Sequence, residues 1–127
     1  MQSADLPPAV RRFIGQYLTS IEQLEVLQLL AANAASAWTA PAVYKSILTN
    51  TASIEQCLER FTAAGFLEKE PGTPPSYRWA ATGETAAVAA ELSRLYVEMP
   101  VRIIAAIYQP GKAVREFADA FKLKRQP

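Results

Sequence analysis

The chain has 127 residues, half of them hydrophobic, which is enough for one domain with a sizeable core and too few for two ordinary domains. Its 13 basic and 12 acidic residues nearly cancel, so any binding of nucleic acid or of an anionic membrane must come from a local patch. The lack of histidine removes the commonest general base and metal ligand, and a single cysteine excludes an internal disulfide and the usual zinc sites.

The first predicted helix begins at two prolines and ends near Leu18. Pro7 and Pro8 suit the first turn of a helix, where a backbone N–H group has no intrahelical partner. Apolar residues then recur at helical spacing. They predict a buried face formed by Val10, Phe13, Ile14 and Tyr17.

A second and more apolar helix is predicted from Ile21 to Asn33. Thr19 and Ser20 each precede a glutamate or glutamine by three residues, which is the spacing of a capping box. Apolar side chains leave only a narrow polar stripe on this helix, and a helix of this kind is usually the central one. The apolar positions are Ile21, Leu24, Val26, Leu27, Leu29 and Leu30.

A helix-turn-helix is predicted next, after a short strand at Trp38 and Thr39. Thr39 can cap a third helix, and Pro41 can open it. Residues 49–51 have the length of a turn between two such helices, and Asn50 is the residue most suited to a left-handed backbone there. The side chains expected to point inward from the third helix are Val43, Tyr44, Ile47 and Leu48.

A fourth helix, predicted over residues 52–64, leads into a β-hairpin. Gly65 is placed to accept a positive φ at the helix C-terminus and to release the chain into a strand over residues 66–70. A second strand over residues 77–80 follows a loop rich in Pro and Gly, which predicts a hairpin with an exposed tip. Cys57 lies in the apolar stripe of the helix, so we expect a core residue rather than a reactive thiol. The stripe consists of Ile54, Cys57, Leu58 and Phe61.

Further helices are predicted after the hairpin. One long helix begins near Gly83, and Pro100 must kink or break it. A last helix follows Pro110 and Gly111. The number of large apolar side chains in these helices favours a homodimer, and the alternative is that the helices fold back on their own domain. The expected dimer contact is formed by Leu92, Leu95, Tyr96, Ile103, Ile107, Phe117 and Phe121.

This order of elements resembles the winged helix-turn-helix of bacterial transcriptional regulators of the MarR and ArsR type. The resemblance covers roughly residues 20–80, and its most characteristic piece is Leu58 to Leu67, which reads L-x-x-F-x-x-x-G-F-L. It implies a mainly α fold with a small β-hairpin wing, flanking helices at 7–18 and 84–121, and a single domain over residues 1–127. In such proteins the helices that flank the wing are where two copies pair.

The resemblance also implies a partner, double-stranded DNA. In regulators of this type the second helix of the motif enters the major groove, and the wing reaches the backbone or the adjacent minor groove. Glutamine suits adenine, and the cations would contact phosphates. The side chains placed against DNA are Lys45, Ser53, Gln56, Arg60, Lys69 and Arg78, on a surface that also holds Ala52, Glu55 and Glu59.

The charge distribution favours a second interpretation, a winged helix that binds another protein instead of DNA. Residues 52–64 carry a net charge of −1, and residues 66–80 carry none. Phosphate neutralisation supplies nearly all non-specific affinity for DNA, so this surface starts with little of it. Residues 110–127 carry +3, which either favours a helix C-terminus through its dipole or contacts DNA or a membrane surface.

Other classes of function have little support. The carboxylates are scattered over predicted solvent-exposed faces and no glycine-rich phosphate loop occurs, so we expect neither an enzyme nor a bound metal or cofactor. The N-terminus does not resemble a signal peptide, and no apolar stretch reaches the roughly 18 residues that a membrane span needs. We therefore expect a cytoplasmic protein without a membrane partner.

Overall fold

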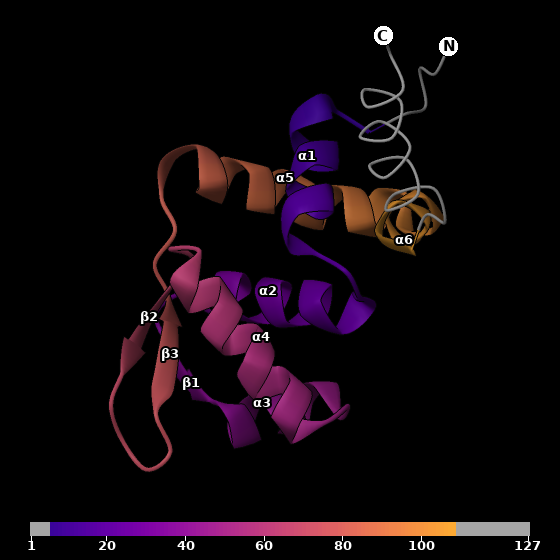
Figure 1. Ribbon diagram of the computed structural model, residues 1–127. Coiled ribbons are helices and arrows are strands. Elements are labelled where there is room, and N and C mark those ends of the chain that lie inside the picture. The colour runs from indigo at the N-terminus through magenta and orange to yellow at the C-terminus, as the bar shows by residue number, and fades with distance from the viewer. Residues whose placement is uncertain (1–5, 109–127) are drawn as a thin grey trace, which may run out of the picture.

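The structure is a computed structural model that describes residues 6–108, and in that range it contains six helices and three strands (Figure 1). The predicted order of elements is confirmed there, with ends close to the expected ones. The helices are α1 Pro8–Tyr17, α2 Ile21–Ala32, α3 Ala40–Ile47, α4 Thr51–Ala63, α5 Gly83–Glu98 and α6 Pro100–Tyr108. The strands are β1 Ala37–Thr39, β2 Leu67–Glu70 and β3 Ser76–Trp79. The predicted last helix lies outside the described residues.

Local sequence determines where the helices begin and end. The Ser20 side chain accepts a hydrogen bond from the Gln23 backbone N–H at 3.2 Å, and Thr39 does the same for Ala42 at 3.2 Å. Gly65 has a φ of 89°, a conformation that strains residues with a Cβ, and it directs the chain out of α4. The break between α5 and α6 falls at the predicted proline.

Helix α2 occupies the centre of the molecule, as its composition predicted. It packs against α3, α4 and α5 and also contacts β3, while α1 lies across α5 and contacts α6 (Figure 1). The most buried side chains of α2 are at most 1% exposed: Leu24, Val26, Leu27 and Leu30. The helix-turn-helix and the flanking helices therefore share one hydrophobic core.

The sheet has three antiparallel strands in the order β1-β3-β2, so β1 extends the predicted hairpin by one strand. Tyr77 of β3 lies opposite both Trp38 and Lys69, and these side chains share one face of the sheet. Tyr77 is buried, since it is only 3% exposed. The β2–β3 hairpin, residues 67–79, is the wing.

Phe66 joins the wing to the rest of the core. Its ring centroid lies 4.8 Å from that of Tyr17, 5.4 Å from Phe13, 5.6 Å from Phe61 and 6.4 Å from Trp79. Aromatic pairs at such distances stabilise beyond the burial of their area. One side chain therefore connects α1, α4 and β3 at the base of the hairpin.

Two expectations about the turn between α3 and α4 are wrong. Tyr44 and Leu48 do not point inward, since they are 37% and 68% exposed. Helix α3 ends at Ile47, so helical periodicity does not apply to Leu48. The left-handed residue is Leu48, with a φ of 62°, because Asn50 is extended, with a φ of −156°, and caps α4 instead.

Four residues of the expected dimer contact lie inside the protomer. Leu92, Leu95, Ile103 and Ile107 are at most 4% exposed, so a second copy cannot reach them in this conformation. Tyr96 is partly buried against the same core, and Phe117 and Phe121 lie outside the described residues. The exposed apolar side chains of α5 and α6 are different ones: Val97, Val101, Ile104 and Tyr108.

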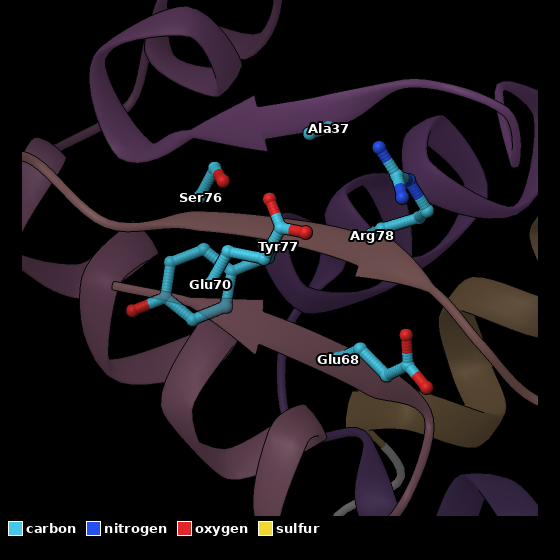
Figure 2. Close-up of a pocket in the computed structure, with 6 residues that line it drawn as sticks. All are labelled: Ala37, Glu68, Glu70, Ser76, Tyr77 and Arg78. Carbon is cyan, nitrogen blue, oxygen red and sulfur yellow. The ribbon is translucent and has the colours of Figure 1, made fainter. Parts of the chain in front are cut away.

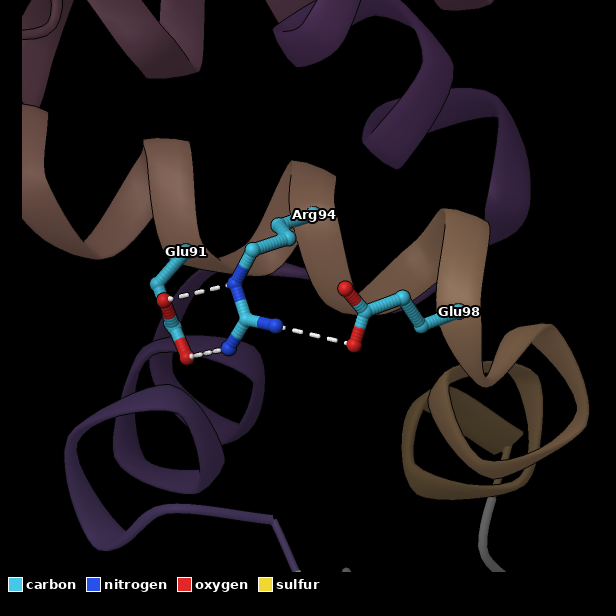
Figure 3. A network of polar contacts seen from close by, with 3 residues as sticks. All are labelled: Glu91, Arg94 and Glu98. Carbon is cyan, nitrogen blue, oxygen red and sulfur yellow. Dashed lines mark hydrogen bonds and ion pairs between the residues drawn. The ribbon is translucent and has the colours of Figure 1, made fainter.

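The solvent side of α5 carries a network of charged side chains (Figure 3). Arg94 donates from Nε to Glu91 at 3.2 Å, forms a second hydrogen bond with Glu91, and donates to Glu98 at 2.8 Å. These contacts hold the pKa of the Glu91 carboxyl below its usual value, and pairs at such spacing stabilise a helix modestly. In residues 6–108 no helix combines the length and the apolar character of a membrane span.

Candidate nucleic-acid interface

The outward face of α4 and the wing form one charged surface, which we call the α4–wing surface. The inner face of α4 is buried in the core, since Ile54, Cys57, Leu58 and Phe61 are at most 2% exposed, and this fixes which side chains face outward. The outward side chains of α4 are Thr51, Ala52, Ser53, Glu55, Gln56, Glu59 and Arg60. The wing adds Lys69 on the sheet face toward α4, and Glu68, Glu70 and Arg78 on the opposite face.

A carboxylate from α2 holds the N-terminal end of α4. The Ser53 hydroxyl donates to Glu22 at 2.7 Å, and Thr49 donates to the same carboxylate oxygen. Asn50 caps the helix by accepting from the Ser53 backbone N–H at 3.0 Å. Glu22 thus supplies a negative charge where the α4 dipole favours one, and a phosphate would compete with it there.

A second carboxylate connects α4 to the wing. Glu59 accepts a hydrogen bond from Lys69 Nζ at 2.6 Å and another from the Tyr77 hydroxyl. Lys69 Nζ also lies 5.8 Å from the centre of the Tyr77 ring. The lysine of the wing is therefore already paired with the helix that should approach DNA.

These contacts shift the protonation of the groups involved. The hydrogen bond from Lys69, followed by that from Tyr77, holds the pKa of the Glu59 carboxyl below its usual value. Burial, followed by the hydrogen bond to Glu59, raises the pKa of Tyr77. Burial also raises the pKa of Cys57 to about 12, so this thiol stays protonated and behaves as the predicted core residue.

The other predicted cations differ in their surroundings. Lys45 is exposed on α3 and forms no ion pair within the described residues. Arg60 donates to the backbone oxygen of Tyr17 at 3.4 Å, which places its guanidinium at the C-terminal end of α1, where the helix dipole favours a cation. Arg60 can therefore stabilise the C-terminal end of α1 within the protomer.

Arg78 lies on the outer face of the sheet beside a small pocket (Figure 2). Its guanidinium group is on the β1 side of β3, away from Glu68 (Figure 2). The residues that line the pocket are Ala37, Glu68, Glu70, Ser76, Tyr77 and Arg78. The pocket is thus lined by two carboxylates against one cation, and it belongs to the wing rather than to the hydrophobic core.

The structure brings only some of the predicted DNA-binding residues together. Ser53, Gln56 and Arg60 lie on α4, and Lys69 joins them through Glu59, whereas Arg78 lies on the opposite face of the sheet. The sequence analysis missed Glu22 and Tyr77, whose hydrogen-bond partners are distant in the chain: Ser53 is 31 residues from Glu22, and Glu59 is 18 residues from Tyr77. No local pattern marks such contacts. The described residues hold no group of three His, Cys, Asp or Glu side chains that could bind a metal ion.

Comparison with known proteins identifies the type of fold. No protein-family model matches the sequence, and no curated protein is significantly similar to it. Among solved structures, the reduced form of MarR from E. coli aligns with a TM-score of 0.51 at 15% identity, covering 94% of this chain and 96% of that chain. A transcriptional regulator from Thermotoga maritima aligns with a TM-score of 0.50 at 12% identity, covering 93% of this chain and 87% of that chain.

Both alignments extend well beyond residues 20–80, so the likeness includes the helices that flank the wing. It therefore concerns the arrangement of the whole chain rather than a helix-turn-helix alone. At these levels of identity it is a likeness of fold. The chain has a winged helix-turn-helix fold of the MarR type.

Proposed function

We propose that the protein is a transcriptional regulator that binds double-stranded DNA through the α4–wing surface. The observation that supports this proposal is the position of Gln56, exposed near the middle of α4 on a helix fixed by its buried inner face, with a wing beside it. A helix held in this way can enter a major groove, where glutamine pairs with adenine. Two transcriptional regulators have the same overall fold.

The proposed role requires no catalysis, and we place it in the cytoplasm. The likeness of fold to a transcriptional regulator from Thermotoga maritima supports a role of this kind. The regulator would act by binding to its site on DNA. Its affinity should fall as the salt concentration rises, but both the affinity and the slope should be modest, because few cations on this surface are free to neutralise phosphates.

A titration with a random-sequence duplex tests the proposal, and two exposed cations offer a matched comparison. Lys45 lies on α3 beside α4, and Arg102 lies on α6 at the other end of the molecule (Figure 1). Replacing Lys45 with Gln should flatten the plot of log affinity against log salt by about 0.9, the value for one lost phosphate contact. Arg102→Gln should leave the slope unchanged. Equal effects of the two substitutions would contradict the placement of the DNA.

Gln56 tests base recognition separately from phosphate contacts. Gln56→Ala should leave binding of random duplex nearly unchanged and should weaken binding to a selected duplex by about 1–3 kcal/mol, the range for a good base contact. Sequence selection with wild-type protein supplies that duplex. If the same sequences are selected by wild type and by Gln56→Ala, this residue does not read bases.

The charge of the surface supports a second candidate, a winged helix that binds another protein. Lys69 is neutralised by Glu59, Glu55 is exposed on α4, and Glu68 and Glu70 are exposed on the outer face of the wing. Such a surface repels a polyanion more than it attracts one. Failure to bind any duplex even at low salt would favour this candidate over the regulator.

We also propose that the protein forms a homodimer under either function. The support is the exposed apolar stripe at the end of α5 and along α6, where Val97 and Val101 are 81% and 77% exposed. On α6, Ile104 and Tyr108 follow Val101 at helical spacing, at 38% and 52% exposed, and the Tyr108 hydroxyl accepts a hydrogen bond from the Ile21 backbone N–H at 2.8 Å. Such a stripe is typical of a surface that pairs with another copy or with another segment of the same chain.

Light scattering after size-exclusion chromatography tests the pairing. Wild type should elute as a dimer at micromolar concentration, and Val101→Glu should elute as a monomer that remains folded, because Val101 is not part of the protomer core. A monomeric wild type would contradict the proposed homodimer. A dimer that survives Val101→Glu would place the contact elsewhere.

A further inference from the structure

We propose that Glu59 limits the affinity of the α4–wing surface for DNA, because its carboxylate holds Lys69 and so withholds the lysine of the wing from any phosphate that does not displace it. This inference rests on the proposed DNA-binding function. Glu59 lies within the proposed DNA-binding surface but weakens DNA binding. The effect is a lower affinity for duplexes of any sequence, so that binding depends more on base contacts.

The geometry makes the two donors to Glu59 unequal. Tyr77 is 3% exposed and anchored in the sheet, so its hydroxyl keeps the carboxylate in place. The Lys69 side chain is 40% exposed and flexible, and its Nζ lies 2.6 Å from the same oxygen. Lys69 can therefore leave while Glu59 remains fixed at the junction of helix and wing.

The exposure of the pair allows such an exchange. The Glu59 side chain is 50% exposed, and ion pairs between exposed side chains are weak and screened by salt. A phosphate can replace the carboxylate as the partner of Lys69, but the exchange breaks one ion pair to form another. It also leaves the negative charge of Glu59 unpaired beside the DNA backbone. Random DNA thus gains little from Lys69, whereas a site that Gln56 recognises has base contacts in addition.

Glu55 provides a matched control on the same helix. It is one turn away from Glu59, is exposed, and carries the same charge, and it influences Tyr77 only through the electrostatic field. Within residues 6–108 it forms no hydrogen bond or ion pair with the wing. Replacing it with Gln changes the net charge of α4 as Glu59→Gln does and leaves the pairing of Lys69 intact.

The experiment compares wild type, Glu55→Gln, Glu59→Gln, Lys69→Gln and the double variant Glu59→Gln/Lys69→Gln. Each is titrated with a random-sequence duplex over a range of salt. Glu59→Gln should bind about twofold to fivefold more tightly than Glu55→Gln, the factor for releasing one exposed ion pair. Its slope of log affinity against log salt should be steeper by about 0.9, because Lys69 now releases a counterion. Lys69→Gln should cancel this excess in the double variant.

Two outcomes overturn the inference while leaving the proposed function standing. Equal increases in affinity from Glu55→Gln and Glu59→Gln would show that Glu59 acts only through its charge and not by holding Lys69. An excess that persists in the double variant would show direct repulsion between Glu59 and phosphate rather than the withholding of Lys69. If none of the five proteins binds duplex at low salt, the proposed function fails and this inference fails with it.

A measurement on wild-type protein without DNA tests the pairing independently of any variant's folding. An amine-acylating reagent modifies a lysine more slowly when its Nζ is held by a carboxylate, and Lys45 serves as an internal reference because it is exposed and forms no ion pair within the described residues. Mass spectrometry should show slower modification of Lys69 than of Lys45 in wild type, and similar rates in Glu59→Gln. Equal rates in wild type would overturn the inference.

Discussion

The two ends of the molecule are stabilised in different ways. At the end formed by α1, α5 and α6, the contacts between helices are apolar, and the side chains that make them are almost completely buried. At the end formed by α4 and the wing, two carboxylates, Glu22 and Glu59, hold the outward face in place through hydroxyl groups and a lysine. One end therefore depends on packing and the other also on charge.

This difference predicts which perturbation each end resists. Truncation of apolar side chains should damage the α5–α6 end most, and changes of charge or pH should act on the α4–wing end. It also separates the two proposed partners. A second copy of the chain suits an exposed apolar stripe, while a macromolecule recognised by polar contacts suits the α4–wing surface.

The largest effect is expected for Leu92→Ala on α5. Leu92 is 0% exposed, so the substitution removes buried methyl groups and leaves a cavity, at a cost of about 2–5 kcal/mol in the free energy of unfolding. Val97→Ala on the same helix is the control. At protein concentrations low enough for a monomer, it should change stability by less than about 0.5 kcal/mol, since Val97 is 81% exposed in the protomer. Urea denaturation followed by circular dichroism measures both.

Protein concentration distinguishes the role of Leu92 in the protomer from a role in pairing. If Leu92 belongs to the core of one protomer, the loss of stability in Leu92→Ala should be the same at low and high protein concentration. A loss that grows on dilution, together with a monomeric variant, would assign Leu92 to the dimer contact and contradict the arrangement of α5 and α6.

The features of the fold that could be predicted from the sequence are those that depend on residues close together in the chain. The ends of α2, α3 and α4 were predictable because Ser20, Thr39 and Gly65 act on their immediate neighbours. The burial of Leu58 and Phe61 followed from helical spacing for the same reason. The placement of Leu48 failed because spacing does not tell where a helix stops.

The candidate site was predictable only in part. The sequence placed Gln56 on the outward face of α4, but it left Glu22 and Glu59 as ordinary charges of solvated helix faces. Their partners come from other elements, and the pairing of Glu59 with Lys69 depends on how the wing docks on α4. Periodicity likewise could not decide whether Ile103 faces its own protomer or a second copy, because both environments are apolar.

A smaller effect is expected for Asn50→Ala at the α4–wing end. The Asn50 side chain caps α4 by accepting from the Ser53 backbone N–H, and loss of such a cap costs about 1 kcal/mol. Asn50→Asp keeps an acceptor in the same place and should stay close to wild type. If the alanine and aspartate variants are equally stable, the cap does not contribute, and the end of α4 is held by Glu22 alone.

The turn between α3 and α4 should become more stable with Leu48→Gly. Leu48 has a φ of 62° and is 68% exposed, so glycine relieves backbone strain and loses little packing. The greater freedom of glycine in the unfolded chain offsets part of the gain, which leaves about 0.5–1 kcal/mol of stabilisation. Ser46→Gly, within α3, should instead destabilise by about 0.5–1 kcal/mol. A destabilised Leu48→Gly would mean that the Leu48 side chain is covered in the intact protein.

The smallest effect is the pH dependence that Glu59 gives to the α4–wing end. The pKa of Glu59 is lowered in the folded protein, chiefly by the hydrogen bond from Lys69, so its contribution to stability is complete above the unfolded pKa of about 4.5. That contribution is lost as the pH falls through the lower folded pKa, because protonation ends the ion pair. Thermal unfolding of wild type and Glu59→Gln should therefore differ by a constant amount near neutral pH and converge as the pH falls below about 4.5 and through the lower folded pKa. The difference should be small because the pair is exposed. A gap that stays constant into strong acid would show that the carboxylate acts through its shape and hydrogen bonds rather than its charge, and the contrast between the two ends would then rest on packing alone.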